Sequence, residues 1–144
     1  MRGELVGSMV FDTSTLLELI YSTERGRKLK EALKSERVLG NTTEVNIAEV
    51  RYVLCRRVGE EESKRRVDAL ISSGYITLHE ISRLVDYASQ YKCRRSLSLV
   101  DCFTLALAKK MDAPVVFARK EEELLREMSR EKFDVEILFL EDIA

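Results

Sequence analysis

The chain of 144 residues has no apolar run near the roughly 18 residues that a membrane span needs. Its opening residues, MRGELVGS, are too polar to form the apolar core of a secretory signal. Its three cysteines form no Cys-x-x-Cys pair, and its single histidine, His79, has no cysteine at zinc-ligand spacing. We therefore expect a cytoplasmic protein with reduced cysteines, no structural zinc and no membrane association.

The chain also lacks a dominant charge, since its formal net charge is −1. The total charge therefore does not indicate a nucleic-acid binder. The basic residues are grouped, however, at Arg56-Arg57, at 64–66 and at 92–95. Such clusters either bind phosphate groups or form solvated helix faces paired with acids, and the sequence leaves both interpretations open.

No internal repeat, low-complexity stretch or linker divides the chain, and its length and 45% hydrophobic content suit one globular domain. We expect residues 9–144 to form that domain. Residues 1–8 are expected to be an N-terminal extension, either native or left from cloning, with Met9 as the natural start.

Short apolar runs alternate with helical patterns along the whole domain. The pattern predicts strands at 9–11, 38–40, 75–78, 114–118 and 135–140. It predicts helices that follow the polar turn 13–15 and that cover 24–35, 45–58, 60–73, 82–94, 99–111 and 121–130. This alternation is typical of α/β proteins, so we expect a three-layer α/β/α fold around a central, mainly parallel sheet.

Asp12 directly follows the first apolar strand. Ligands of open α/β sheets collect beyond the carboxyl ends of the strands, which favours a binding role for this acid. A helix-capping role is the structural alternative, because the next residues begin a helix.

Glu49 lies inside the apolar helix 45–58, where its neighbours are expected to be buried. A buried carboxylate is costly unless it is paired, protonated or bound to a metal ion. Neither Arg51 nor Arg56 has the spacing of three or four residues that would pair it with Glu49. The alternative is a solvated glutamate on a polar stripe of the helix.

Asp101 is predicted in the first turn of the apolar helix 99–111, where the helix dipole also favours an acid. We expect Ser98 to cap this helix through the backbone of Asp101. Because capping is then already provided by Ser98, the carboxylate of Asp101 is predicted to be functional.

In this order the three acids resemble the motifs of the PIN domain family, metal-dependent ribonucleases that include the toxins of VapBC-type toxin–antitoxin pairs. The resemblance extends from Met9 to about Leu140. The matching segments are Val10-Phe11-Asp12-Thr13-Ser14, Asn46-Ile47-Ala48-Glu49-Val50 and Leu97-Ser98-Leu99-Val100-Asp101, the last followed by Ala106 and Ala108.

The resemblance implies hydrolysis of RNA phosphodiester bonds with Mg²⁺ or Mn²⁺, for which hard oxygen ligands are suited. It makes Asp12, Glu49 and Asp101 the catalytic residues and metal ligands. It also implies RNA as substrate, an antitoxin protein as partner of a toxin, and a homodimer. The residues expected to orient a ligand or water around the acids are Thr13, Ser14 and Ser98.

The chain departs from the family at the fourth acidic position. The family commonly shows Thr-Gly/Ala-Asp-x-Asp/Glu-Phe there, whereas this chain reads Phe117-Ala118-Arg119-Lys120-Glu121-Glu122. Arg119 replaces the usual aspartate, and Glu121 is expected to be the further metal ligand, with Glu122 as its substitute. Arg119 either holds a phosphate or weakens the site, and the acids could simply suit a helix N-terminus.

The alternative function is therefore a catalytically impaired PIN-like domain that binds RNA or a protein. Two other classes that begin with a strand-end acid do not fit. A haloacid-dehalogenase-type phosphatase needs a second aspartate where this chain has Ser14, and a receiver domain needs an acidic pair near its start.

Overall fold

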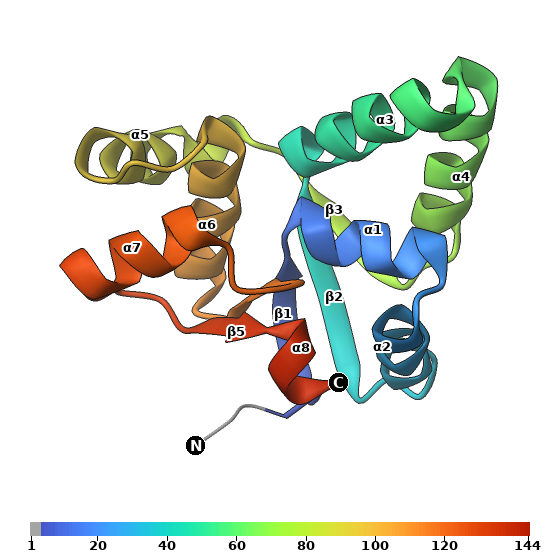
Figure 1. Ribbon diagram of the computed structural model, residues 1–144, viewed down its shortest axis with the longest axis horizontal. Helices are drawn as coiled ribbons and strands as arrows, with labels where there is room; N and C mark the ends of the chain where they lie inside the picture. The colour runs from blue at the N-terminus through green and yellow to red at the C-terminus, as the bar shows by residue number, and fades with distance from the viewer. Residues whose placement is uncertain (1–3) are drawn as a thin grey trace.

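The computed structural model of the protein describes residues 4–144. Five strands form one sheet in the order β3-β2-β1-β4-β5, and each neighbouring pair is parallel (Figure 1). The predicted three-layer α/β/α fold is confirmed. The strands are β1 (Gly7–Phe11), β2 (Val38–Thr43), β3 (Ile76–His79), β4 (Val115–Phe117) and β5 (Ile137–Phe139).

Helices cover both faces of the sheet because successive strand residues point to opposite faces. Met9 and Phe11 of β1 pack into one core, while Val10 between them packs into the other. The first core contains residues of α1 (Thr13–Tyr21), α2 (Glu24–Lys34), α3 (Glu44–Val58), α4 (Glu60–Ser72) and α8 (Leu140–Ile143). The second contains residues of η1 (Ser82–Leu84), α5 (Val85–Arg94), α6 (Leu99–Met111) and α7 (Glu122–Arg130).

The second strand is longer than predicted, because Asn41, Thr42 and Thr43 also pair with β3. Side chains attach the same segment to β1. The Nδ2 atom of Asn41 donates to Met9 O (3.3 Å), and Thr42 Oγ1 donates to Phe11 O (2.9 Å). Both residues lie beyond the strand predicted at 38–40, and the next residue, Thr43, caps α3. The helix predicted over 82–94 also divides, into η1 and α5.

The predicted N-terminal extension lies partly outside the described residues, since 1–3 are not among them. Strand β1 begins at Gly7, which is paired with Val38, and Leu5 packs against the first core. The division of the chain at Met9 stays a prediction. No helix within residues 4–144 is both long and apolar enough to cross a membrane.

The order of the strands reverses at β1. The chain moves from β1 outward to β2 and β3, then returns to the other side of β1 for β4 and β5. Ligands of open α/β sheets bind beyond the carboxyl ends of the strands at such a reversal. The fold therefore directs attention to the ends of β1 and β4.

Candidate functional site

Asp12 lies at the carboxyl end of β1 and is buried, with 6% of its surface exposed. One carboxylate oxygen, Oδ2, accepts hydrogen bonds from Ser14 N (3.0 Å) and Ser14 Oγ (2.7 Å). Asp12 is therefore the N-cap of α1, as the structural alternative required. The other oxygen, Oδ1, is buried and has no hydrogen-bond partner among residues 4–144. Capping thus accounts for only half of this carboxylate.

The start of α1 is fixed to the end of β4. Ala118 N donates to Ser14 Oγ (2.9 Å), while Thr15 Oγ1 and Asp12 N donate to Val116 O over 2.8 and 3.0 Å. These bonds hold the Asp12 carboxylate at a constant place relative to the segment that follows β4. Ser14, expected to orient a ligand or water, orients Asp12 itself.

Asn46, which sequence reasoning missed, joins the helices that carry the acids. It is fully buried near the start of α3. Its Nδ2 atom donates to Thr13 Oγ1 (3.1 Å) on α1 and to Thr104 Oγ1 (2.9 Å) on α6. Its Oδ1 atom accepts from Thr43 Oγ1 (2.7 Å). The available signal was the Thr-x-x-Asn spacing of a capping box at residues 43–46, just before the predicted helix 45–58.

Asp101 lies in the first turn of α6, and its backbone N–H donates to Ser98 Oγ (3.1 Å). The predicted cap is confirmed. The carboxylate of Asp101 is therefore not needed to cap α6, and its side chain lines the same cleft as Asp12.

Glu49 lies one helical turn after Asn46 on α3 and is only half-buried. The expectation that it is surrounded by buried residues was therefore too strong. The helix exposes Ala48 and Tyr52 on either side of it in sequence. Its role is thus indicated by position rather than by the cost of burial.

These side chains line one cleft of about 580 Å³ beyond the ends of β1 and β4. Apart from Glu122, the structure brings together the residues predicted for the site. Their roles as metal or substrate ligands stay predictions. Six acids and two arginines line the cleft, together with Thr13, Ser14 and Ser98. The charged residues are Asp12, Glu18, Glu49, Asp101, Glu121, Glu123, Arg57 and Arg119.

The acids share the cleft without forming a finished metal site. Within residues 4–144, no group of three or more His, Cys, Asp or Glu side chains could hold a metal ion as the side chains stand. Glu122, the predicted substitute for Glu121, is not among the residues that line the cleft and pairs with Arg126 (3.1 Å) on α7.

The cleft favours protonated acids. Burial raises the pKa of Asp12 to about 6, against the two hydrogen bonds from Ser14, and Glu49 and Glu121 add a repulsive contribution. Burial also raises the pKa of Asp101 to about 7, followed by repulsion from Asp12. Both carboxyl groups would therefore be stabilised in their charged form by a nearby cation.

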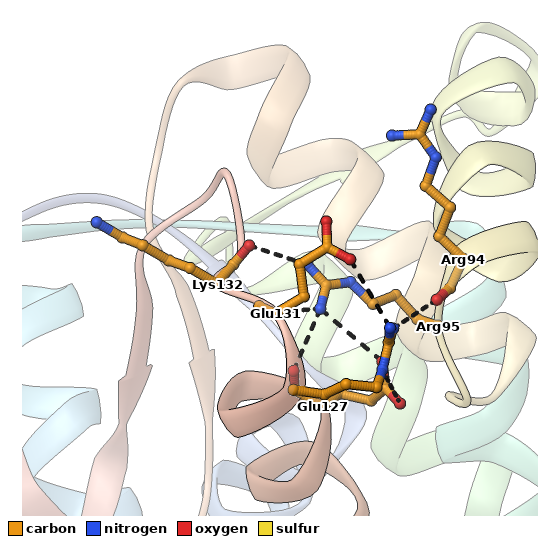
Figure 2. A network of polar contacts seen from close by, with 6 residues as sticks. Arg94, Arg95, Glu127, Glu131 and Lys132 are labelled. Carbon is orange, nitrogen blue, oxygen red and sulfur yellow. Dashed lines mark hydrogen bonds and ion pairs between the residues drawn. The ribbon is translucent and has the colours of Figure 1, made fainter.

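The basic cluster at 92–95 is largely structural. Arg95 is buried and donates to the carbonyl oxygens of Glu127, in the last turn of α7, and of Glu131 and Lys132, which follow the helix (Figure 2). Its guanidinium carbon also lies 3.8 Å from the ring centroid of Phe133. The phosphate-binding interpretation of this cluster is therefore wrong for Arg95, which stabilises the end of a helix.

The comparison with solved structures shows the same fold in three toxin or toxin–antitoxin structures. VapC20 of Mycobacterium tuberculosis, described as a Sarcin-Ricin loop cleaving toxin, is 19% identical, with a TM-score of 0.64 over 82% of this chain and 94% of that one. DNA-bound VapBC of Salmonella typhimurium is 15% identical, with a TM-score of 0.69 over 92% and 98%. VapBC2 of Rickettsia felis, bound to a promoter DNA fragment, is 12% identical, with a TM-score of 0.68 over 90% and 96%.

At these identities the likeness establishes the shared fold. No curated protein matches the sequence. The family model described as "PIN domain" matches residues 9–131. This range is most of the chain and includes Asp12, Glu49 and Asp101. The chain belongs to the PIN domain family.

Proposed function

We propose that this PIN domain is a Mg²⁺- or Mn²⁺-dependent ribonuclease that hydrolyses RNA phosphodiester bonds, and that it is the toxin of a VapBC-type pair. The single observation that carries the proposal is the Oδ1 atom of Asp12. This oxygen is buried without a hydrogen-bond partner among residues 4–144, in the wall of a cleft lined by further acids. A native protein rarely leaves such an atom unsatisfied unless a ligand completes it.

The donor set fits a hard divalent cation. Mg²⁺ and Mn²⁺ prefer carboxylate oxygens, and the cleft offers those of Asp12, Glu49, Asp101 and Glu121. Without a cation these groups repel one another, which is consistent with the raised pKa values of Asp12 and Asp101. When bound, the cation would activate a water molecule and neutralise charge on the scissile phosphate.

The protein's own contribution is orientation. Ser14 holds one oxygen of Asp12 and leaves the other free for a ligand. Asn46 fixes the starts of α1, α3 and α6 relative to one another, so that acids from three helices face one cleft. Ser98 keeps the first turn of α6 closed and thereby positions Asp101.

The proposal is tested by incubating the purified protein with a mixed RNA pool in Mg²⁺, in Mn²⁺ and in EDTA. Cleavage is expected with either metal and not in EDTA. Asp12→Asn and Asp101→Asn should abolish it, whereas the control Asp86→Asn, which alters an exposed acid on α5, should not. Cleavage that persists equally in both cleft variants would remove these acids from the reaction.

A second candidate function is an impaired PIN-like domain that binds RNA or protein without cutting RNA. Arg119 favours it, because this cation lines the cleft where the family commonly has an acid. The same assay separates the two candidates. Retention of labelled RNA with no cleavage in either metal would support the binding module, and restored cleavage in Arg119→Asp would identify the arginine as the cause.

An antitoxin partner follows from the toxin assignment, since two of the compared structures are VapBC complexes. A homodimer is also expected. Exposed apolar residues that could serve it are present on two helices, with Ile71 of α4 at 37% and Val85 of α5 at 47% exposure. Co-purification with the product of a small neighbouring gene tests the first proposal, and light scattering tests the second.

A further inference from the structure

The cleft continues from the acids as a groove between α1 and α3. On α3 it is lined by Glu49, Val53 and Arg57, which are four residues apart and therefore share one helix face. On α1 it is lined by Leu17 and Tyr21 at the same spacing, and by Glu18 between them. Figure 1 shows the two helices next to each other, with α1 starting at the end of β1 and α3 at the end of β2. Arg57 is thus two turns, about 12 Å, beyond Glu49 along α3.

Arg57 and Tyr21 form a pair at the far end of this groove. The guanidinium carbon of Arg57 lies 5.3 Å from the centroid of the Tyr21 ring, within the range of a cation–π contact. The ring therefore limits the positions that the guanidinium can take. The Tyr21 hydroxyl is buried and has no hydrogen-bond partner among residues 4–144. Two hydrogen-bonding groups that the described part of the chain does not satisfy are therefore held together in the groove.

The charge of Arg57 is also not neutralised within the protein. Across residues 4–144, no carboxylate forms an ion pair with Arg57 within 4.0 Å. Arg57 and Arg119 are the basic residues among those that line the cleft. They lie on opposite sides of Asp12, because α3 follows β2, Arg119 follows β4, and β1 lies between those strands.

We propose that Arg57, held by Tyr21, is a substrate-binding residue that contacts the RNA backbone at a phosphate flanking the scissile bond. The inference rests on the proposed ribonuclease function. It adds the path of the bound RNA, which runs from Arg57 across the acids toward Arg119. An arginine on an aromatic ring suits a phosphodiester because its planar donors stay charged and directed. The acids alone would repel the strand, so a cationic contact outside the metal site supplies local attraction.

A neighbouring pair on the same helix provides a matched control. Arg56 lies over the ring of Tyr52 with its guanidinium carbon 5.1 Å from the centroid, and both residues are exposed and outside the cleft lining. Arg56→Ala and Arg57→Ala therefore remove the same charge from adjacent positions of the same helix, which face different directions. Only the second removes it from the groove.

The first experiment is single-turnover cleavage of a labelled single-stranded RNA oligonucleotide in Mg²⁺ at increasing protein concentration. Arg57→Ala should raise the half-saturating concentration about tenfold, with the maximal rate changed less than about twofold, since the lost contact is a charged hydrogen bond outside the reacting atoms. Arg57→Lys should recover part of the affinity, and Arg56→Ala should leave both values unchanged.

The second experiment measures binding of the same RNA by fluorescence anisotropy in Ca²⁺ at several salt concentrations. The slope of log affinity against log salt should fall in magnitude by about 0.7 for Arg57→Ala, the loss of one phosphate contact to a single strand. It should not change for Arg56→Ala. Tyr21→Phe keeps the ring and should weaken binding less than Arg57→Ala does.

The inference is overturned if Arg57→Ala and Arg56→Ala behave alike, or if Arg57→Ala lowers the maximal rate at unchanged half-saturation. Failure of the nuclease proposal is a different result, in which the unaltered protein cuts no RNA in either metal. The anisotropy comparison still decides the role of Arg57 in that case, because it requires no cleavage. Thermal unfolding of each variant shows whether a loss of affinity comes from a loss of fold.

Discussion

Asn46 Nδ2 donates a hydrogen bond to Thr104 Oγ1 over 2.9 Å. The two residues are 58 positions apart in the chain, and their bond joins α3 to α6. Both residues are fully buried. Thr104 Oγ1 in turn donates to Val100 O (2.9 Å), one turn earlier on α6. The geometry of the cleft thus depends on an amide that contacts none of the reacting groups proposed for it.

Replacement of Asn46 by alanine should lower the free energy of unfolding by at least about 2 kcal/mol, because buried hydroxyl groups lose their partners. Urea denaturation measures this change. Ser89→Ala, which removes an exposed hydroxyl on α5, should change it by less than about 0.5 kcal/mol. Equal stability of the two variants would show that the buried network is not needed to hold the three helices together.

Arg95→Ala should destabilise the protein by about 2–4 kcal/mol, since three carbonyl groups near the end of α7 lose a charged donor and Phe133 loses its stacking partner. The matched control is Arg94→Ala. The adjacent Arg94 side chain is exposed and should contribute less than about 0.5 kcal/mol. A similar loss in both variants would contradict the helix-capping role of Arg95.

The raised pKa values of Asp12 and Asp101 predict how stability depends on pH in EDTA. The folded protein keeps these protons up to about pH 6 and 7, whereas an unfolded chain releases them near 3.8. Between these values the folded state binds more protons, so the free energy of unfolding of the native sequence falls as pH rises.

Asp12→Asn cannot ionise and should therefore be more stable than the native sequence at pH 8, on the order of 2 kcal/mol, with the difference vanishing near pH 4. Thermal unfolding of both proteins across this pH range measures the difference. A pH-independent difference for Asp12→Asn would mean that the carboxylate is not strained by its burial.

Much of the site could be predicted from local pattern. Asp12 follows an apolar strand, and Ser98 precedes an apolar helix, so each signal lies within a few residues of the position that it predicts. The parallel sheet with helices on both faces also followed from the alternation of strand and helix, whereas the order of the strands was not predicted. The prediction for Glu49 was weaker because apolar neighbours in sequence do not determine burial on every side of a helix.

The remaining features depend on contacts between distant residues. Tyr21 and Arg57 are brought together only when α1 packs beside α3. Arg95 and Glu127 meet only when α7 packs against the segment before α6. The sequence alone therefore presented Arg56 and Arg57 as one basic cluster, although the fold assigns only Arg57 to the cleft.

Arg119 should weaken metal binding, because its positive charge lines the same cleft as the acids. Arg119→Asp is expected to raise the affinity for Mn²⁺ about tenfold or more in isothermal titration calorimetry, as a further ligand replaces a repelling cation. Arg126→Asp makes the same charge change on the exposed face of α7 and should leave the affinity unaltered.

The same titration distinguishes the two glutamates predicted for the fourth position. Glu121→Gln should weaken Mn²⁺ binding, whereas Glu122→Gln should not, since only Glu121 lines the cleft. The reverse order would place the metal site away from this cleft.

The central claim is that Asp12, Glu49 and Asp101 support metal-dependent hydrolysis of RNA. It is tested most directly by identifying the ends of the fragments that the protein makes from one defined RNA. The account predicts 5′-phosphate and 3′-hydroxyl ends, formed in Mg²⁺ and absent in EDTA, in Asp12→Asn and in Asp101→Asn, because a water molecule attacks the phosphate. Fragments with 2′,3′-cyclic phosphate ends, formed equally in EDTA and in both variants, would contradict it.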